Sequence, residues 1–121
     1  MRVFKNAWFG RFAQKARISD NALRQAIGRA EQGLIDADLG GGVIKQRIAR
    51  PGGSKAKGFR AVVLYRKGAR AFFVYGFPKS QRGDMREDEE AQFKRAARAI
   101  LDLSDEQISR LIGKGQLEEV S

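Results

Sequence analysis

Residues 59–77 have the sequence FRAVVLYRKGARAFFVYGF, and this stretch decides the fold. It contains two runs, Phe59 to Arg66 and Arg70 to Phe77, that are rich in β-branched and aromatic residues, and such residues favour strands. The segment between them, Lys67-Gly68-Ala69, is short and contains glycine, which is typical of a hairpin turn. We therefore predict an antiparallel hairpin whose two strands are the central strands of a sheet.

A further strand is predicted just before this hairpin, at Val43-Ile44-Lys45-Gln46-Arg47-Ile48. Because side chains alternate along a strand, Lys45 and Arg47 should share one face while Ile44 and Ile48 occupy the other. The segment Pro51 to Gly58 is rich in glycine and lysine and is predicted to be a cationic loop.

Helices are predicted on both sides of this β region in the sequence. A short strand at Arg2 to Lys5 precedes a helix capped near Asn6, whose Trp8, Phe9 and Phe12 are expected in the core. A second helix should begin at Ser19 and continue to Leu34 along a stripe of apolar residues: Leu23, Ala26, Ile27, Ala30 and Leu34.

After the hairpin the pattern becomes helical again near Arg86, with acidic residues in the first turn, and Ser104 fits the cap of a short final helix. The predicted fold class is α+β: a small antiparallel twisted sheet covered by an N-terminal helical hairpin and a C-terminal helix. We expect these helices on one side of the sheet, with Lys45 and Arg47 on the uncovered side.

Composition narrows the class of protein. The length of 121 residues suits a single domain spanning 1–121, and 42% hydrophobic residues suffice for a core. There is no cysteine and no histidine, so a thiolate metal site and histidine acid–base catalysis are excluded, and we expect no cofactor. The sequence shows neither a signal peptide nor an apolar run long enough for a membrane span, which predicts a cytoplasmic protein.

The positive charge is concentrated in one region. The formal net charge is +10, and Val43 to Gly83 contains no acidic residue but eleven basic ones: Lys45, Arg47, Arg50, Lys55, Lys57, Arg60, Arg66, Lys67, Arg70, Lys79 and Arg82. A surface kept basic only for solubility normally mixes both signs, so a polyanionic partner is the favoured interpretation. Single-stranded RNA fits best, because aromatic residues lie among the cations. The predicted RNA-binding residues are Lys55, Lys57, Phe59, Arg66 and Tyr75.

Three segments in this order carry a resemblance to a known family: Val43-Ile44-Lys45-Gln46-Arg47, Gly58-Phe59-Arg60-Ala61-Val62-Val63, and Phe72 to Lys79. Nearly the whole chain resembles the RelE/HigB toxins of bacterial type II toxin–antitoxin systems, within the RelE/ParE superfamily. The resemblance implies an endoribonuclease, or mRNA interferase, that cuts messenger RNA on the ribosome and inhibits translation. It also implies a cognate antitoxin as partner, expected to be of the helix-turn-helix type.

The same resemblance assigns candidate catalytic residues: Lys45, Arg47, Arg60, Lys79 and Arg82. The family's reaction is attack of a ribose 2′-hydroxyl on the neighbouring phosphate, without a metal. Arg60 would bind the phosphate, and Lys79 or Arg82 would assist the leaving group. Lys45, or Lys55 or Lys57 from the loop, would be the general base, because clustered cations favour a neutral amine. Ser80 and Arg86 stand where the family often has an arginine and a tyrosine.

Two other functions are compatible with the sequence. A ParE-like protein would inhibit DNA gyrase by binding and would cleave nothing, whereas a plain RNA-binding module would bind RNA with a steep salt dependence and leave it intact. The basic residues Lys45, Arg47 and Arg60 on one predicted sheet favour cleavage.

Overall fold

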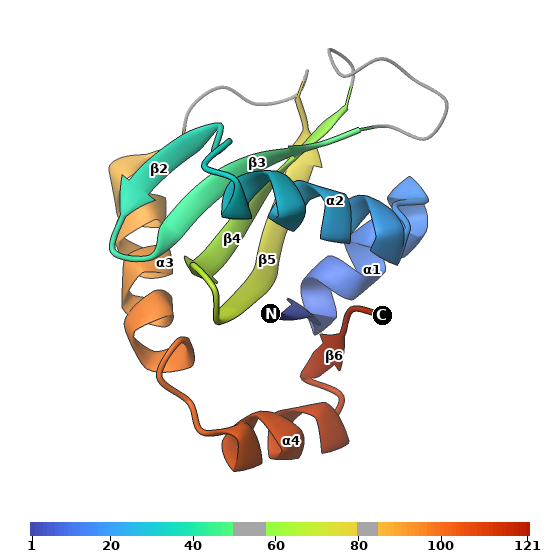
Figure 1. Cartoon of the computed structure of the whole chain (residues 1–121), viewed down its shortest axis with the longest axis vertical. Coiled ribbons are helices and arrows are strands. Elements are labelled where there is room, and N and C mark those ends of the chain that lie inside the picture. The colour runs from blue at the N-terminus through green and yellow to red at the C-terminus, as the bar shows by residue number, and fades with distance from the viewer. Residues whose placement is uncertain (50–57, 80–84) are drawn as a thin grey trace.

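The computed structural model describes residues 1–49, 58–79 and 85–121 of the chain. Six strands and four helices lie within these ranges (Figure 1). In chain order they are β1 (Arg2–Asn6), α1 (Ala7–Ala16), α2 (Asp20–Glu31), β2 (Ala37–Gly40), β3 (Val43–Ile48), β4 (Phe59–Arg66), β5 (Arg70–Pro78), α3 (Glu87–Ile100), α4 (Asp105–Gly113) and β6 (Leu117–Glu119). The predicted α+β class is confirmed.

All six strands form one sheet in the order β2-β3-β4-β5-β1-β6. Neighbouring strands are antiparallel, except that β1 runs parallel to β5. The hairpin of β4 and β5 is central, as predicted, and Gly68 occupies its turn with a φ of 72°, which glycine adopts without steric cost. The register shifts between Val62 and Val63, so β5 has a bulge there.

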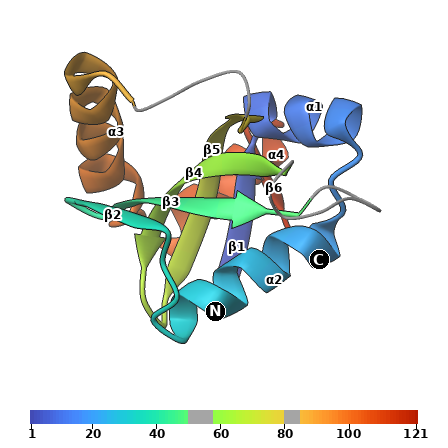
Figure 2. The same cartoon turned by 90° about the horizontal axis from the view of Figure 1, so that it is seen from above.

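Helices cover both faces of the sheet, so the prediction of helices on one side only is wrong. On one face, α1 and α2 pack on β3, β4 and β5 through residues such as Phe9, Ile27 and Phe73. On the other face, α3 and α4 form a second core with residues such as Leu64 and Leu101. In Figure 2, α2 and α3 lie on opposite sides of β3. Lys45 and Arg47 therefore share their face with α3, and that face is not uncovered as predicted.

The ends of the N-terminal helices follow the predicted caps closely. The side chain of Asn6 accepts a hydrogen bond from the backbone N–H of Phe9 at 2.7 Å, and Ser19 accepts one from Ala22 at 3.1 Å. The second helix is shorter than predicted, because it ends at Glu31 and leaves Leu34 outside it with 60% of its surface exposed.

The C-terminal segment completes the core. After α4, the strand β6 pairs with β1 at one edge of the sheet, and Leu117 and Val120 are buried. The N–H of Val120 also donates to the carbonyl of Val3 at 2.8 Å. None of the helices in the described ranges has the length and hydropathy needed to cross a membrane.

Candidate nucleic-acid interface

The three predicted basic residues of the sheet lie on one face, at one end. Arg47 of β3 is directly opposite Arg60 of β4, and Lys45 lies two residues before Arg47, opposite Val62. Because directly opposite residues of an antiparallel pair point to the same side, all three side chains leave the sheet on the face of α3. We call Lys45, Arg47 and Arg60 the cation cluster.

Arg60 has no carboxylate partner among the residues that the structure describes. No ion pair within the described ranges includes it, and its Nε is buried without a hydrogen-bond acceptor. A buried donor without an acceptor costs about 1–3 kcal/mol, so a folded protein rarely contains one. Arg60 thus forms no ion pair with the described acidic residues of the C-terminal helices. Its guanidinium is suited to an anion supplied from outside.

Arg47 and Lys45 differ from Arg60 in their surroundings. The Nε of Arg47 lies 3.7 Å from a carboxylate oxygen of Asp36, and the backbone N–H of Arg47 donates to the same carboxylate. Asp36 therefore holds Arg47 near the end of β3 and neutralises part of its positive charge, although 45% of the Arg47 side chain is exposed. Lys45 is nearly buried, with 5% of its surface exposed.

Gln46 supports the cluster and was not singled out from the sequence. Its side chain points to the opposite face, is fully buried, and makes three hydrogen bonds. It donates to the carbonyls of Ala26 and Leu34 at 2.9 and 3.2 Å and accepts from the N–H of Asp36 at 2.9 Å. The sequence does contain a sign of this role: Gln46 is a polar residue on the same predicted face as the apolar Ile44 and Ile48.

The end of β5 brings aromatic residues beside the cluster. Phe77 is directly opposite Arg60, and Lys79 follows at the same end of the sheet, where its N–H donates to the carbonyl of Gly58 at 3.1 Å. Tyr75 and Phe77 approach the first turns of α3, where they form a small pocket with Met85, Glu89 and Phe93. The predicted residues Lys79 and Tyr75 thus lie close to the cation cluster.

Two predicted RNA-binding residues are not brought to the cluster. Phe59 points to the opposite face, is 6% exposed and contacts the ring of Phe12 beneath α1. Arg66 lies six residues from Arg60, about 20 Å along β4, and pairs with Asp102 at 2.8 Å. The remaining predicted residues, Lys55, Lys57 and Arg82, lie outside the described residues.

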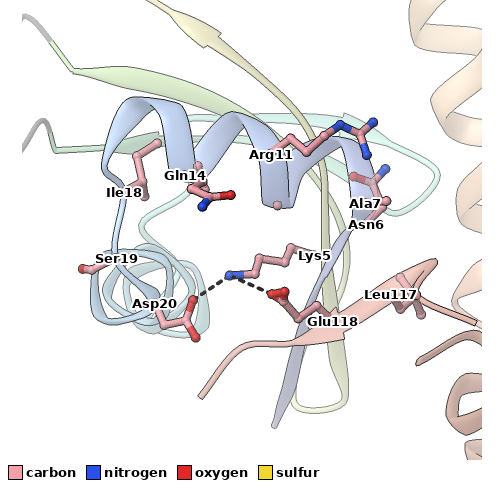
Figure 3. A pocket seen from close by; sticks show the side chains of 13 residues that line it. Lys5, Asn6, Ala7, Arg11, Gln14, Ile18, Ser19, Asp20, Leu117 and Glu118 are labelled. Carbon is pink, nitrogen blue, oxygen red and sulfur yellow. Dashed lines mark hydrogen bonds and ion pairs between the residues drawn. The ribbon is translucent and has the colours of Figure 1, made fainter. Parts of the chain in front are cut away.

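A hollow elsewhere in the described part of the chain contains a network of ion pairs. It measures about 650 Å³ and lies among α1, the start of α2, β1 and β6 (Figure 3). The ammonium group of Lys5 bridges Asp20 at 2.9 Å and Glu118 at 3.5 Å. Burial lowers the pKa of Lys5, but the two carboxylates outweigh it and raise the pKa overall. Burial similarly raises the pKa of Asp20, while hydrogen bonds from Ser121 and Lys5 lower it overall. This network fixes β6 and the C-terminus.

The fold and the cation cluster together define a small α+β protein that gathers basic side chains on one face of its sheet. Comparison with protein families gives the particular family: the model described as the RelE toxin of the RelE / RelB toxin–antitoxin system matches residues 1–120. The chain belongs to the RelE toxin family. A search of curated proteins found no match. The protein is thus the toxin of a toxin–antitoxin system, a family whose members are generally endoribonucleases, and it has an antitoxin as partner.

Proposed function

We propose that this toxin cleaves messenger RNA on the ribosome and that the cation cluster binds the scissile phosphate. The observation that carries the proposal is the buried Nε of Arg60, which lacks an acceptor, on the same face as Lys45 and Arg47. A phosphate whose binding uncovers this nitrogen would supply the missing acceptor. Arginine binds phosphate through two parallel N–H groups, so Arg60 can both hold and orient the group.

In the proposed reaction the ribose 2′-oxygen attacks the neighbouring phosphorus, and the bond from phosphorus to the 5′-oxygen breaks. The products are a 2′,3′-cyclic phosphate and a 5′-hydroxyl. Negative charge grows on the phosphoryl oxygens in the transition state, where fixed cations have their greatest effect. Arg60 and Arg47 stabilise this charge, Lys45 accepts the proton of the 2′-hydroxyl, and Lys79 donates a proton to the leaving oxygen. Lys55 and Lys57 are the alternatives to Lys45 as the base. Arg82 is the alternative to Lys79 at the leaving oxygen.

The decisive experiment compares Arg60→Ala with the wild type in a ribosome-dependent cleavage assay, with primer extension on a translated messenger RNA. Removing one cation that faces transition-state charge should lower the cleavage rate about 10²-fold or more. The fold should tolerate the change, because the Nε of Arg60 has no partner that would be left without a bond. Arg98→Ala is the matched control, since Arg98 is exposed on α3 and makes no ion pair with a described residue.

An Arg60→Ala protein that melts like the wild type and still cleaves at the wild-type rate would refute the assignment. Growth arrest in which DNA replication stops before translation would instead support gyrase inhibition. RNA binding without cleavage or growth arrest would support the binding module. Co-expression of the antitoxin should relieve the arrest in the wild type, and we propose that this antitoxin presents an acidic segment to the cation cluster.

A further inference from the structure

One face of α1 exposes aromatic and basic side chains together. Trp8, Arg11, Phe12 and Lys15 recur at intervals of three and four residues, so they form a single stripe along the helix. The four side chains line a shallow pocket of about 230 Å³. Trp8 is 39% exposed, although the sequence predicted it in the core. We call these four residues the α1 stripe.

The two cations of the α1 stripe form no ion pair with a described residue. Both of them, Arg11 and Lys15, are exposed. The helix itself contains no acidic residue. Figure 3 shows Arg11 pointing away from the network of Lys5, Asp20 and Glu118. A partner of this surface should therefore supply negative charge.

The α1 stripe is continuous with the aromatic residues beside Arg60. The ring of Trp8 stacks on Tyr75 with centroids 4.6 Å apart, and it also stacks on Phe12 at 5.4 Å. Tyr75 lies two residues from Phe77, about 7 Å along the strand, and Phe77 is directly opposite Arg60. A row of rings thus leads from the cation cluster to α1.

We propose that the α1 stripe binds a second stretch of the same single-stranded RNA whose scissile phosphate lies at Arg60. This inference rests on the proposed function, which supplies the identity of the bound nucleic acid as the RNA that is cleaved at Arg60. Rings with flanking cations match the two chemical features of a single strand, because bases stack on rings and phosphates pair with Lys and Arg. A protein partner would match a broader aliphatic surface, and the α1 stripe contains no aliphatic side chain besides the stems of Arg11 and Lys15.

Trp8 is the only tryptophan of the protein, so its fluorescence reports directly on this surface. The probe is a single-stranded 2′-O-methyl RNA dodecamer, which cannot be cleaved because the nucleophilic hydroxyl is blocked. Binding should quench the emission of Trp8 and protect it from acrylamide. The double variant Arg11→Glu, Lys15→Glu should weaken binding about tenfold or more, and the slope of log K against log salt should become shallower by about 1.4 for two lost phosphate contacts.

The matched control is Arg98→Glu combined with Lys114→Glu, which changes the net charge by the same amount at exposed positions on α3 and after α4. It should weaken binding no more than about threefold, because long-range attraction is largely screened at physiological salt. Thermal melting of both double variants checks that each is folded.

Equal losses in the two double variants, unchanged Trp8 emission on saturation, or no dodecamer binding would each overturn the inference. Quenching by the antitoxin but not by the dodecamer would overturn it in favour of a protein partner. The result is separable from the proposed function. Arg60→Ala should lower ribosome-dependent cleavage about 10²-fold or more yet still show Trp8 quenching by the dodecamer. The α1 double variant should require about tenfold more dodecamer for the same quenching.

Discussion

Replacing Gln46 by leucine should destabilise the protein strongly, although Gln46 lies on the face away from the cation cluster. Its fully buried amide joins β3 to α2 and to the segment that carries Asp36, through three hydrogen bonds. Leucine has a similar volume and no polar atoms, so Gln46→Leu removes the hydrogen bonds while opening only a small cavity.

The magnitude follows from the groups left without a partner. The N–H of Asp36 and the carbonyl of Leu34 lose their bonds to the side chain, while Ala26 lies within α2 and can keep its helical bond. A buried group left unsatisfied costs about 1–3 kcal/mol. The expected loss is therefore about 3 kcal/mol in the free energy of unfolding, or roughly 10 °C in melting temperature for a chain of this length.

Urea unfolding followed by circular dichroism measures this loss, and the m-value should be unchanged if both proteins unfold in two states. Gln92→Leu is the matched control, because Gln92 is exposed on α3, and its effect should stay within about 0.5 kcal/mol. A Gln46→Leu protein within 0.5 kcal/mol of the wild type would refute the argument that these hydrogen bonds hold β3.

Two further predictions concern stability. The pKa of Asp20 lies below 3.8, because the hydrogen bonds from the C-terminal backbone and Lys5 outweigh the effect of burial. Its contribution to stability is thus complete above about pH 4 and is lost as the pH falls through its folded-state pKa. Asp20→Asn should lower stability at pH 7 and flatten its decline in acid, and an acid-unfolding curve parallel to the wild type would contradict this. Gly42→Ala should cost about 2–4 kcal/mol in urea unfolding, because φ is 83° and the new Cβ would lie 2.7 Å from Leu101. Gly113→Ala, at an open helical position, should instead be neutral or slightly stabilising.

The central hairpin was predictable because its signals are local. β4 and β5 carry long runs of strand-forming residues, and a glycine turn joins them. β2 and β6 were not predicted, since they have four and three residues and depend on distant partners. β6, for example, pairs with β1 from the other end of the chain. No window of sequence contains that information.

The covering of both faces could have been predicted from β4. Its residues 61–65 are all buried and form a continuous apolar run, which is typical of a strand covered on two sides rather than one. The alternation in β3 led to the one-sided prediction, because the charged Lys45 and Arg47 share one face while Ile44 and Ile48 lie on the other. Lys45 is buried opposite Val62 of the second core, whereas Arg47 lies opposite Arg60 and is 45% exposed.

The same alternation explains both the success and the failure at the site. It correctly places Lys45 and Arg47 on one face, and the antiparallel register adds Arg60. Phe59 precedes Arg60 in the strand, so the two cannot share a face, and the prediction of Phe59 as an RNA-binding residue beside Arg60 was inconsistent with this alternation. The ion pair of Arg47 with Asp36 was not predictable, because it depends on the chain segment that leads into β2.

The acidic residues of the C-terminal region determine which basic residues stay available to a polyanion. At the end of the sheet near α4, the arginines have carboxylate partners, in the pairs Arg66–Asp102, Arg70–Asp105 and Arg2–Glu119. At the opposite end, Arg60 has none among the described residues. Asp102, Asp105 and Glu119 therefore neutralise arginines at one end of the sheet. At the other end Glu89 of α3 lies in a pocket beside Phe77, and no ion pair joins it to Arg60. Binding of an anion at the Arg60 end requires no existing ion pair of Arg60 to break, whereas binding at the Arg66 end would have to compete with Asp102.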